Sequence, residues 1–218
     1  CGGSTESIKG FFHQLDSVKT SINIATLFGH NTVRREVMGL SDRKATAAEQ
    51  QKMEALVAQA MQEGAVGLAT GLIYLPGMYS TTEEVVDLAK SAAAYGGVYA
   101  SHIRNEETKV VEAINEAINI GIEANIPVQI SHFKVSHKAN WGRSKETLAL
   151  IINAREKGYH VTIDQYPYTA GSTNLGVRLP DWALSGGNDS LKIRINDPVI
   201  HKKIIVDMLA QLKEYTYK

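Results

Sequence analysis

Apolar positions along the chain follow two patterns, short β-branched runs and longer stretches with helical spacing. The short runs have the length and composition of strands and cover 21–28, 64–70, 97–101, 127–131 and 160–164. The longer stretches place apolar residues three and four apart and cover 46–63, 83–95, 109–124 and 144–157. A final amphipathic helix is expected over 198–212, after an irregular Gly/Ser/Asn segment at 185–190. This alternation predicts an α/β fold.

Local signals mark two helix boundaries. Thr46 followed by Glu49 has the spacing of a capping box, which predicts a helix start. Gly158 directly follows the stretch 144–157 and suits the position after a helix end.

Strands separated by helices of this length imply parallel strands with right-handed crossovers. An eight-unit barrel typically needs about 250 residues, so five units predict a partial TIM-like (β/α) barrel. An open doubly wound sheet is the alternative, although no strand is followed by a Gly-rich phosphate fingerprint. We expect one domain over 1–218, with strand-helix units in 1–180 and the irregular segment and terminal helix in 181–218. The unpaired edges of such a barrel favour self-association.

Charge and composition exclude several classes of partner. Lysine plus arginine equals aspartate plus glutamate at 23 each, so no overall charge favours nucleic acid or anionic lipid. The pairs Arg34-Arg35 and Lys202-Lys203 are interpreted as solvated faces. No stretch approaches the roughly 20 apolar residues of a membrane helix. Neither nucleic acid nor a membrane is therefore expected as a partner.

The single cysteine, Cys1, excludes an internal disulfide and fits a reducing compartment, so a cytoplasmic location is expected. The chain lacks an initiator methionine and opens with Cys-Gly-Gly-Ser. We therefore expect the gene product to extend upstream of this point.

Two histidines, His102 and His132, end predicted strands in consecutive units, each directly after a serine. Neighbouring strand ends lie close together at the carboxyl face of a barrel. Two imidazoles there can share one metal ion at about 2.0–2.1 Å each. A single strand-end histidine is more often structural, but two in equivalent positions favour metal ligation. His30 also ends a predicted strand and is assigned no role; the remaining histidines are interpreted as surface or structural: His13, His137, His160 and His201.

Four blocks lie at or just after predicted strand ends: GLATGLIYLPG (67–77), SHIRNE (101–106), QISHFK (129–134) and DQYPYTAGST (164–173). They resemble, in order and interval, blocks of the N-acyl-D-amino-acid deacylases of the amidohydrolase superfamily. The segment 29–39 and the opening Cys1-Gly2 also resemble family segments. The resemblance covers about 1–180 and is weaker afterwards.

This resemblance implies a zinc ion held by Cys1, His102 and His132. A thiolate with two imidazoles suits Zn²⁺. The resemblance also implies an N-acyl-D-amino acid as substrate, its carboxylate bound by the side chains of Tyr74, Lys134 and Ser172. A phenol, an ammonium and a hydroxyl are suitable donors for a carboxylate. Arg104 and Glu106 lie nearby by position and are assigned no role.

Two family features have no match in this chain: a His-x-His pair on the first barrel strand and a catalytic aspartate after the last strand. Asp164 ends the fifth predicted strand but does not match that aspartate, so the catalytic residue is unknown. We therefore expect a fragment of a zinc-dependent hydrolase that cleaves the amide of N-acyl-D-amino acids, itself slow or inactive. The alternative is a non-catalytic module that binds a small carboxylate or serves assembly, which fold alone does not separate.

Overall fold

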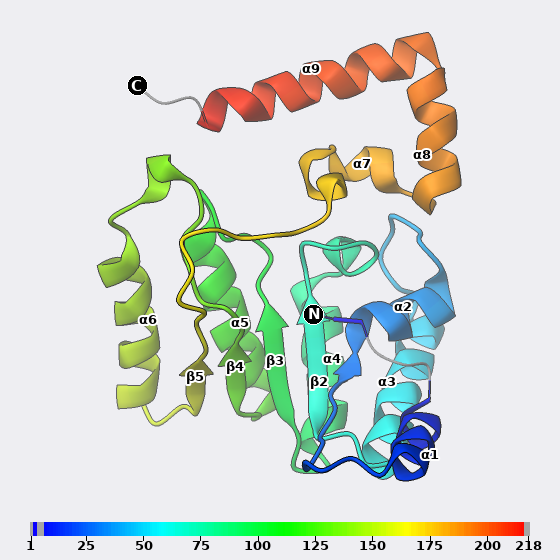
Figure 1. The fold of residues 1–218 in the computed structure, drawn as a ribbon, viewed down its shortest axis with the longest axis vertical. Coiled ribbons are helices and arrows are strands. Elements are labelled where there is room, and N and C mark those ends of the chain that lie inside the picture. The colour runs from blue at the N-terminus through cyan, green and yellow to red at the C-terminus, as the bar shows by residue number, and fades with distance from the viewer. Residues whose placement is uncertain (1, 4–6, 216–218) are drawn as a thin grey trace.

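The computed structural model describes residues 2–3 and 7–215 of the chain. Its sheet has five strands in sequential order, and all neighbouring pairs are parallel. The strands are β1 Phe28–Gly29, β2 Gly67–Gly71, β3 Val98–His102, β4 Val128–Ile130 and β5 Val161–Ile163. Their carboxyl ends all point to one side of the molecule (Figure 1). The predicted α/β architecture of parallel strands alternating with helices is confirmed.

The helices between the strands begin and end within two residues of the predicted positions. They are α3 Ala47–Gln62, α4 Thr82–Ala93, α5 Val110–Ala124 and α6 Ser144–Glu156. The capping box before α3 is present, because the Thr46 hydroxyl accepts from the Glu49 N–H and the Glu49 carboxylate accepts from the Thr46 N–H. These boundaries are set by local hydrogen bonds that the sequence spacing already specifies.

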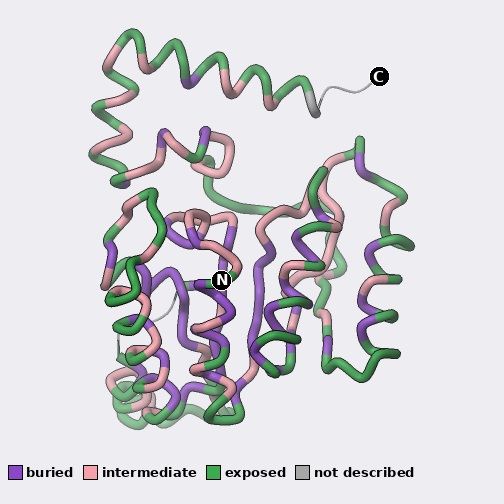
Figure 2. Tube along the Cα trace, turned by 180° about the vertical axis from the view of Figure 1, so that it is seen from behind, coloured by how far each residue is buried: buried purple, intermediate pink, exposed green. Residues whose placement is uncertain are grey.

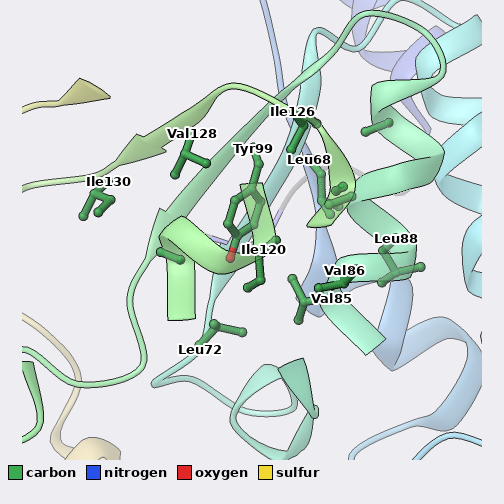
Figure 3. Packing of buried hydrophobic residues seen from close by; sticks show 14 of the residues in the cluster. Leu68, Leu72, Val85, Val86, Leu88, Tyr99, Ile120, Ile126, Val128 and Ile130 are labelled. Atoms are coloured by element: carbon green, nitrogen blue, oxygen red, sulfur yellow. The ribbon is translucent and has the colours of Figure 1, made fainter. Parts of the chain in front are cut away.

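The core lies between the sheet and the helices. Strand residues Leu68, Tyr99, Val128 and Ile130 are buried against helix residues such as Leu88 (Figure 3). Helix α5 lies so close to β4 that a Cβ added at Gly121 would stand 2.1 Å from Val128 Cγ2. The buried residues follow the strands and the inner sides of the helices (Figure 2).

The opposite face of the sheet carries small and polar residues. Ala69, Ala100, Gln129 and Thr162 are aligned across β2 to β5 and alternate with the helix-facing positions. The uncovered face is therefore not strongly apolar. Self-association through the strand edges stays a prediction.

The first predicted strand, 21–28, is shorter than expected. Only Phe28 and Gly29 pair with β2 in the ladder, and Ile22 is 72% exposed. The exposed start of the segment, which includes Ile22, makes no ladder pairing, whereas Leu27 and Phe28 at its end are half-buried and buried. Two helices in this part of the chain were not predicted, α1 Ile8–Val18 and α2 His30–Met38.

The expected irregular segment at 185–190 is also wrong in part, because it includes the start of a helix. The chain forms α7 Asp181–Leu184, α8 Gly187–Asn196 and α9 Pro198–Tyr215. Gly186 and Gly187 both have φ of +79°. This left-handed conformation favours glycine and turns the chain between α7 and α8.

Helices α8 and α9 lie beyond the carboxyl ends of the strands in both views (Figures 1 and 2). The division of one domain into 1–180 and 181–218 stays a prediction. Among the described residues, no helix combines the length and apolarity needed to cross a membrane.

Candidate metal centre

His102 and His132 reach the same place by different backbone routes. His102 is the last residue of β3, pairs with Gly71 of β2 and is 7% exposed. His132 follows β4 and has a left-handed backbone with φ of +42°. A left-handed non-glycine residue costs roughly 1–2 kcal/mol, so this conformation must be held by its surroundings.

Asp164 supplies that support. Its Oδ1 accepts the His132 N–H at 2.6 Å, and its Oδ2 accepts from Gln129 Nε2 at 2.7 Å. The Phe133 N–H donates to the Asp164 carbonyl at 2.8 Å. Asp164 therefore orients the backbone of a candidate ligand.

The two imidazoles face each other. His102 Nδ1 lies 2.7 Å from His132 Nε2, and the ring centroids are 4.4 Å apart. Two zinc–nitrogen bonds of 2.0–2.1 Å at a tetrahedral angle separate the nitrogens by about 3.3 Å. If the two imidazole rings moved slightly apart, their facing nitrogens could therefore bind one ion. The structure brings the two predicted histidines together; ligation itself stays a prediction.

Glu106, which was assigned no role from the sequence, completes the cluster. Its Oε1 lies 2.9 Å from His132 Nδ1 and 2.6 Å from Lys134 Nζ. Candidate ligand atoms of His102, Glu106 and His132 all lie within 4.8 Å of one another. Two imidazoles are donors that zinc accepts, and the Glu106 carboxylate lies at His132 Nδ1, the ring nitrogen that does not face His102.

Electrostatics keep His102 neutral and Glu106 ionised at neutral pH. Burial lowers the pKa of His102 to about 4; the Glu106 carboxylate opposes this shift, and Lys134 adds to it. The ring is therefore neutral at neutral pH, and its buried Nε2 has no hydrogen-bond partner among the described residues. Burial opposes ionisation of Glu106, but bonds from His132 and Lys134 outweigh it and hold the pKa of that carboxyl below its ordinary value. The residues present fit a zinc ion.

Two of the three predicted substrate-binding residues, Tyr74 and Lys134, lie beside the imidazole pair. Lys134 Nζ lies 3.0 Å from His132 Nδ1, and the Tyr74 ring centroid lies 4.9 Å from that of His102. Tyr74 Oη shares a hydrogen bond of 2.9 Å with Thr173 Oγ1, which brings in the segment that holds the exposed Ser172. Their roles stay predictions.

Cys1 lies outside the described residues. Its neighbour Gly2 accepts the Asn31 N–H at 2.7 Å. A Cβ added at Gly2 would stand 2.3 Å from Gly71 N, and Gly71 pairs with His102. The residue that follows Cys1 in the chain therefore lies against the carboxyl end of β2.

Arg104 has a structural role beside the site. Its guanidinium donates to Glu116 at 2.9–3.2 Å and to the Met78 carbonyl at 3.1 Å. Met78 lies in the 3-10 turn η1 Gly77–Tyr79, just after Tyr74. Arg104 thus fixes the loop that carries a candidate substrate ligand.

A second polar cluster is fully buried and was missed from the sequence. Glu84 of α4 pairs with His30 and Arg34 of α2, and both α2 side chains are 0% exposed. Arg34 also donates to the Arg43 carbonyl at 2.6 Å. The interpretation of Arg34 as part of a solvated face is therefore wrong for this residue. His30 and Arg34 stand one helical turn apart, but nothing local links them to Glu84.

Comparison with known proteins finds relatives over most of this chain, although no family model matches it. D-aminoacylase of Alcaligenes xylosoxydans xylosoxydans is 42% identical over 176 residues, which are 80% of this chain and 36% of that protein. A crystal structure of D-aminoacylase, which defines a novel subset of amidohydrolases, aligns with a TM-score of 0.72 at 42% identity. The alignment covers 76% of this chain and 35% of that one.

A third relative carries a metal. N-acyl-D-glutamate deacylase from Bordetella bronchiseptica, solved with zinc and a phosphonate mimic of the tetrahedral intermediate, aligns with a TM-score of 0.72 at 41% identity. That alignment covers 74% of this chain and 34% of the relative, so the chain spans about a third of the length of the proteins it matches. The chain belongs to the D-aminoacylase family of amidohydrolases, and its five strands match part of a D-aminoacylase barrel.

Proposed function

We propose that this chain carries the zinc-binding and carboxylate-binding part of a hydrolase that cleaves N-acyl-D-amino acids to a carboxylic acid and a D-amino acid. The observation that carries this proposal is the 2.7 Å approach of His102 Nδ1 and His132 Nε2 beside Glu106. It occurs in a chain that is 42% identical to a D-aminoacylase.

His102 and His132 would hold the zinc ion. Cys1 is proposed as a further ligand on the family resemblance alone. Bound zinc supplies Lewis-acid polarisation of the acyl carbonyl and a lowered pKa for a bound water. His102 needs no deprotonation to bind at neutral pH, since burial lowers its pKa to about 4.

Tyr74, Lys134 and Ser172 would bind the substrate carboxylate. The Lys134 ammonium already pairs with Glu106 at 2.6 Å, so a second carboxylate would share this cation. The Lys134 ammonium also lies 5.5 Å from the centre of the Tyr166 ring, which limits where it can point. These contacts hold the Lys134 ammonium beside the proposed metal site, which supports its proposed role in binding the substrate carboxylate.

No residue of the chain is assigned as the general base. Asp164 is engaged with the His132 N–H and the Gln129 amide, which supports a positioning role for it. We therefore expect the chain by itself to bind the substrate but to hydrolyse it slowly or not at all.

A comparison of enantiomers tests this function. The zinc-loaded chain should bind N-acetyl-D-amino acids about 10- to 150-fold more tightly than their L enantiomers. The reason is that an L enantiomer with its acyl carbonyl at the metal loses the charge-assisted bond to the carboxylate, worth roughly 1.5–3 kcal/mol. Calorimetric titration with matched D and L pairs measures the ratio. Equal affinities would contradict the proposal, as would a chain that takes up no zinc.

Lys134→Ala should weaken binding of N-acyl-D-amino acids by about 10- to 150-fold, because a charge-assisted bond is lost. Zinc content should stay at the wild-type level. In the full-length protein, kcat/KM should fall by a similar factor. The exposed Lys138, four residues further along, offers a matched control, and Lys138→Ala should change neither quantity. Full affinity in Lys134→Ala, or loss of zinc, would show that Lys134 has another role.

A further inference from the structure

We propose that Glu106 is a positioning residue that selects the tautomer of His132 in which the Nε2 lone pair is available to zinc. This inference rests on the proposed zinc site and adds to it a residue that touches neither the substrate nor the reacting atoms. Its basis is that Lys134 and Glu106 both lie within hydrogen-bond distance of the same ring nitrogen, His132 Nδ1.

Two groups of opposite hydrogen-bonding character approach His132 Nδ1. Lys134 Nζ lies 3.0 Å away and Glu106 Oε1 lies 2.9 Å away. An ammonium has only donors and an ionised carboxylate has only acceptors. Lys134 can therefore bond to Nδ1 only when this atom carries a lone pair, and Glu106 only when it carries the proton. A neutral imidazole has one proton, so the two contacts favour opposite tautomers.

The choice at Nδ1 decides the state of the other nitrogen. His132 Nε2 faces His102 Nδ1 at 2.7 Å. When Lys134 bonds to Nδ1, the proton is on Nε2 and donates to His102, which blocks both nitrogens for a metal. When Nδ1–H donates to Glu106, Nε2 keeps its lone pair. A carboxylate behind a ligating histidine commonly orients the ring and sets its tautomer in this way.

The segment after β3 is held in place, and this keeps the Glu106 carboxylate close to His132 Nδ1. The Ser136 N–H donates to the Glu106 carbonyl at 2.7 Å, which ties the segment after β3 to the segment after β4. Lys134 has other acceptors when Nδ1 is protonated, because its Nζ lies 2.6 Å from Glu106 Oε1 and 3.2 Å from the His132 carbonyl. The ammonium can therefore release Nδ1 and remain bonded.

The next residue in the chain is a matched control. Glu107 is also a partly buried carboxylate, with 17% of its side chain exposed against 12% for Glu106. It pairs with His137 at 2.8 Å and with Arg178 at 3.1 Å. Neither partner is His102 or His132, and Glu107 does not belong to the group of candidate ligand atoms that Glu106 joins, so Glu107 shares the chemistry of Glu106 but not its partners.

The test compares Glu106→Gln with Glu107→Gln in two measurements on the full chain. Competition with a chelator should show zinc affinity reduced about 10- to 100-fold in Glu106→Gln, the usual effect of removing a residue behind a metal ligand. Glu107→Gln should match wild type. Nitrogen-15 NMR of the imidazoles in zinc-free protein should show Nδ1–H on His132 in wild type and a shift towards Nε2–H in Glu106→Gln.

The outcomes separate this inference from the proposed function. Unchanged zinc affinity in Glu106→Gln, with zinc lost in His102→Ala, would overturn the role of Glu106 alone. Unchanged zinc affinity in His102→Ala would overturn the zinc site itself. If Glu106→Gln does not fold, the wild-type spectrum decides: His132 found only as the Nε2–H tautomer would overturn the inference, and a populated Nδ1–H tautomer would support it.

Discussion

Replacing His102 or His132 with alanine should lower the zinc affinity of the chain by about two orders of magnitude. Protein zinc sites gain roughly 10–16 kcal/mol from about four ligands, so one ligand contributes on the order of 3 kcal/mol. The two imidazole nitrogens lie 2.7 Å apart, so each variant should remove one half of the same pair. Zinc content after equilibration in buffered zinc solutions measures the effect.

An exposed histidine provides the control for this experiment. His201 lies on α9, and His201→Ala should bind zinc like wild type. The metal-free variants should keep the far-ultraviolet circular dichroism of wild type, because the sheet is formed by backbone bonds that neither substitution removes. Wild-type zinc affinity in either site variant would show that the imidazole pair is not the metal site.

Glu84→Gln should destabilise the chain by about 3–5 kcal/mol, the usual result of removing one partner from a buried ion pair. Glu84 pairs with Arg34 and His30, and the side chains of these two residues are 0% exposed. The substitution keeps the shape of the side chain but leaves the arginine charge without a counter-ion. Urea denaturation at neutral pH measures the loss. Asp87→Asn on the same helix is the control, because its partner Lys90 is 53% exposed and such pairs contribute little.

The same pair predicts a pH dependence. Burial raises the pKa of Glu84, but the bonds and charges of His30 and Arg34 outweigh it and hold that pKa below its ordinary value. A lowered folded-state pKa means that the stabilisation is present above the unfolded value, about 4.3, and is lost as pH falls through the folded value. The difference in unfolding free energy between wild type and Glu84→Gln should therefore shrink below about pH 4. A constant difference down to pH 2 would contradict this assignment.

Much of the fold could be predicted because its signals are local. Apolar residues at helical spacing gave α3 to α6 within two residues at each end, and Thr46 with Glu49 marked the start of α3. The positions of His102 and His132 at neighbouring strand ends followed from the order of the same elements. Strand order and strand direction then bring the two rings together, since parallel strands end at one edge.

The helices outside this alternation could not be predicted in the same way. Helix α2 has few apolar residues, and it contributes Arg34 to a cluster that only α4 completes. In the stretch 21–27 only Thr26 has a backbone bond to the neighbouring segment, from the Val66 N–H, and the ladder with β2 begins at Phe28. In both cases the outcome depended on distant segments.

By itself, the sequence determined the alternation of strands and helices, the two strand-end histidines and the family resemblance. Only the tertiary structure decided that Glu106 stands behind His132, that Asp164 holds the His132 backbone and that Glu84 neutralises Arg34. Periodicity and capping act between residues within a few positions of each other, where sequence spacing fixes geometry. Buried polar groups instead require partners wherever the fold supplies them, and here those partners lie 26 to 50 residues away, as from Glu106 to His132 and from Arg34 to Glu84.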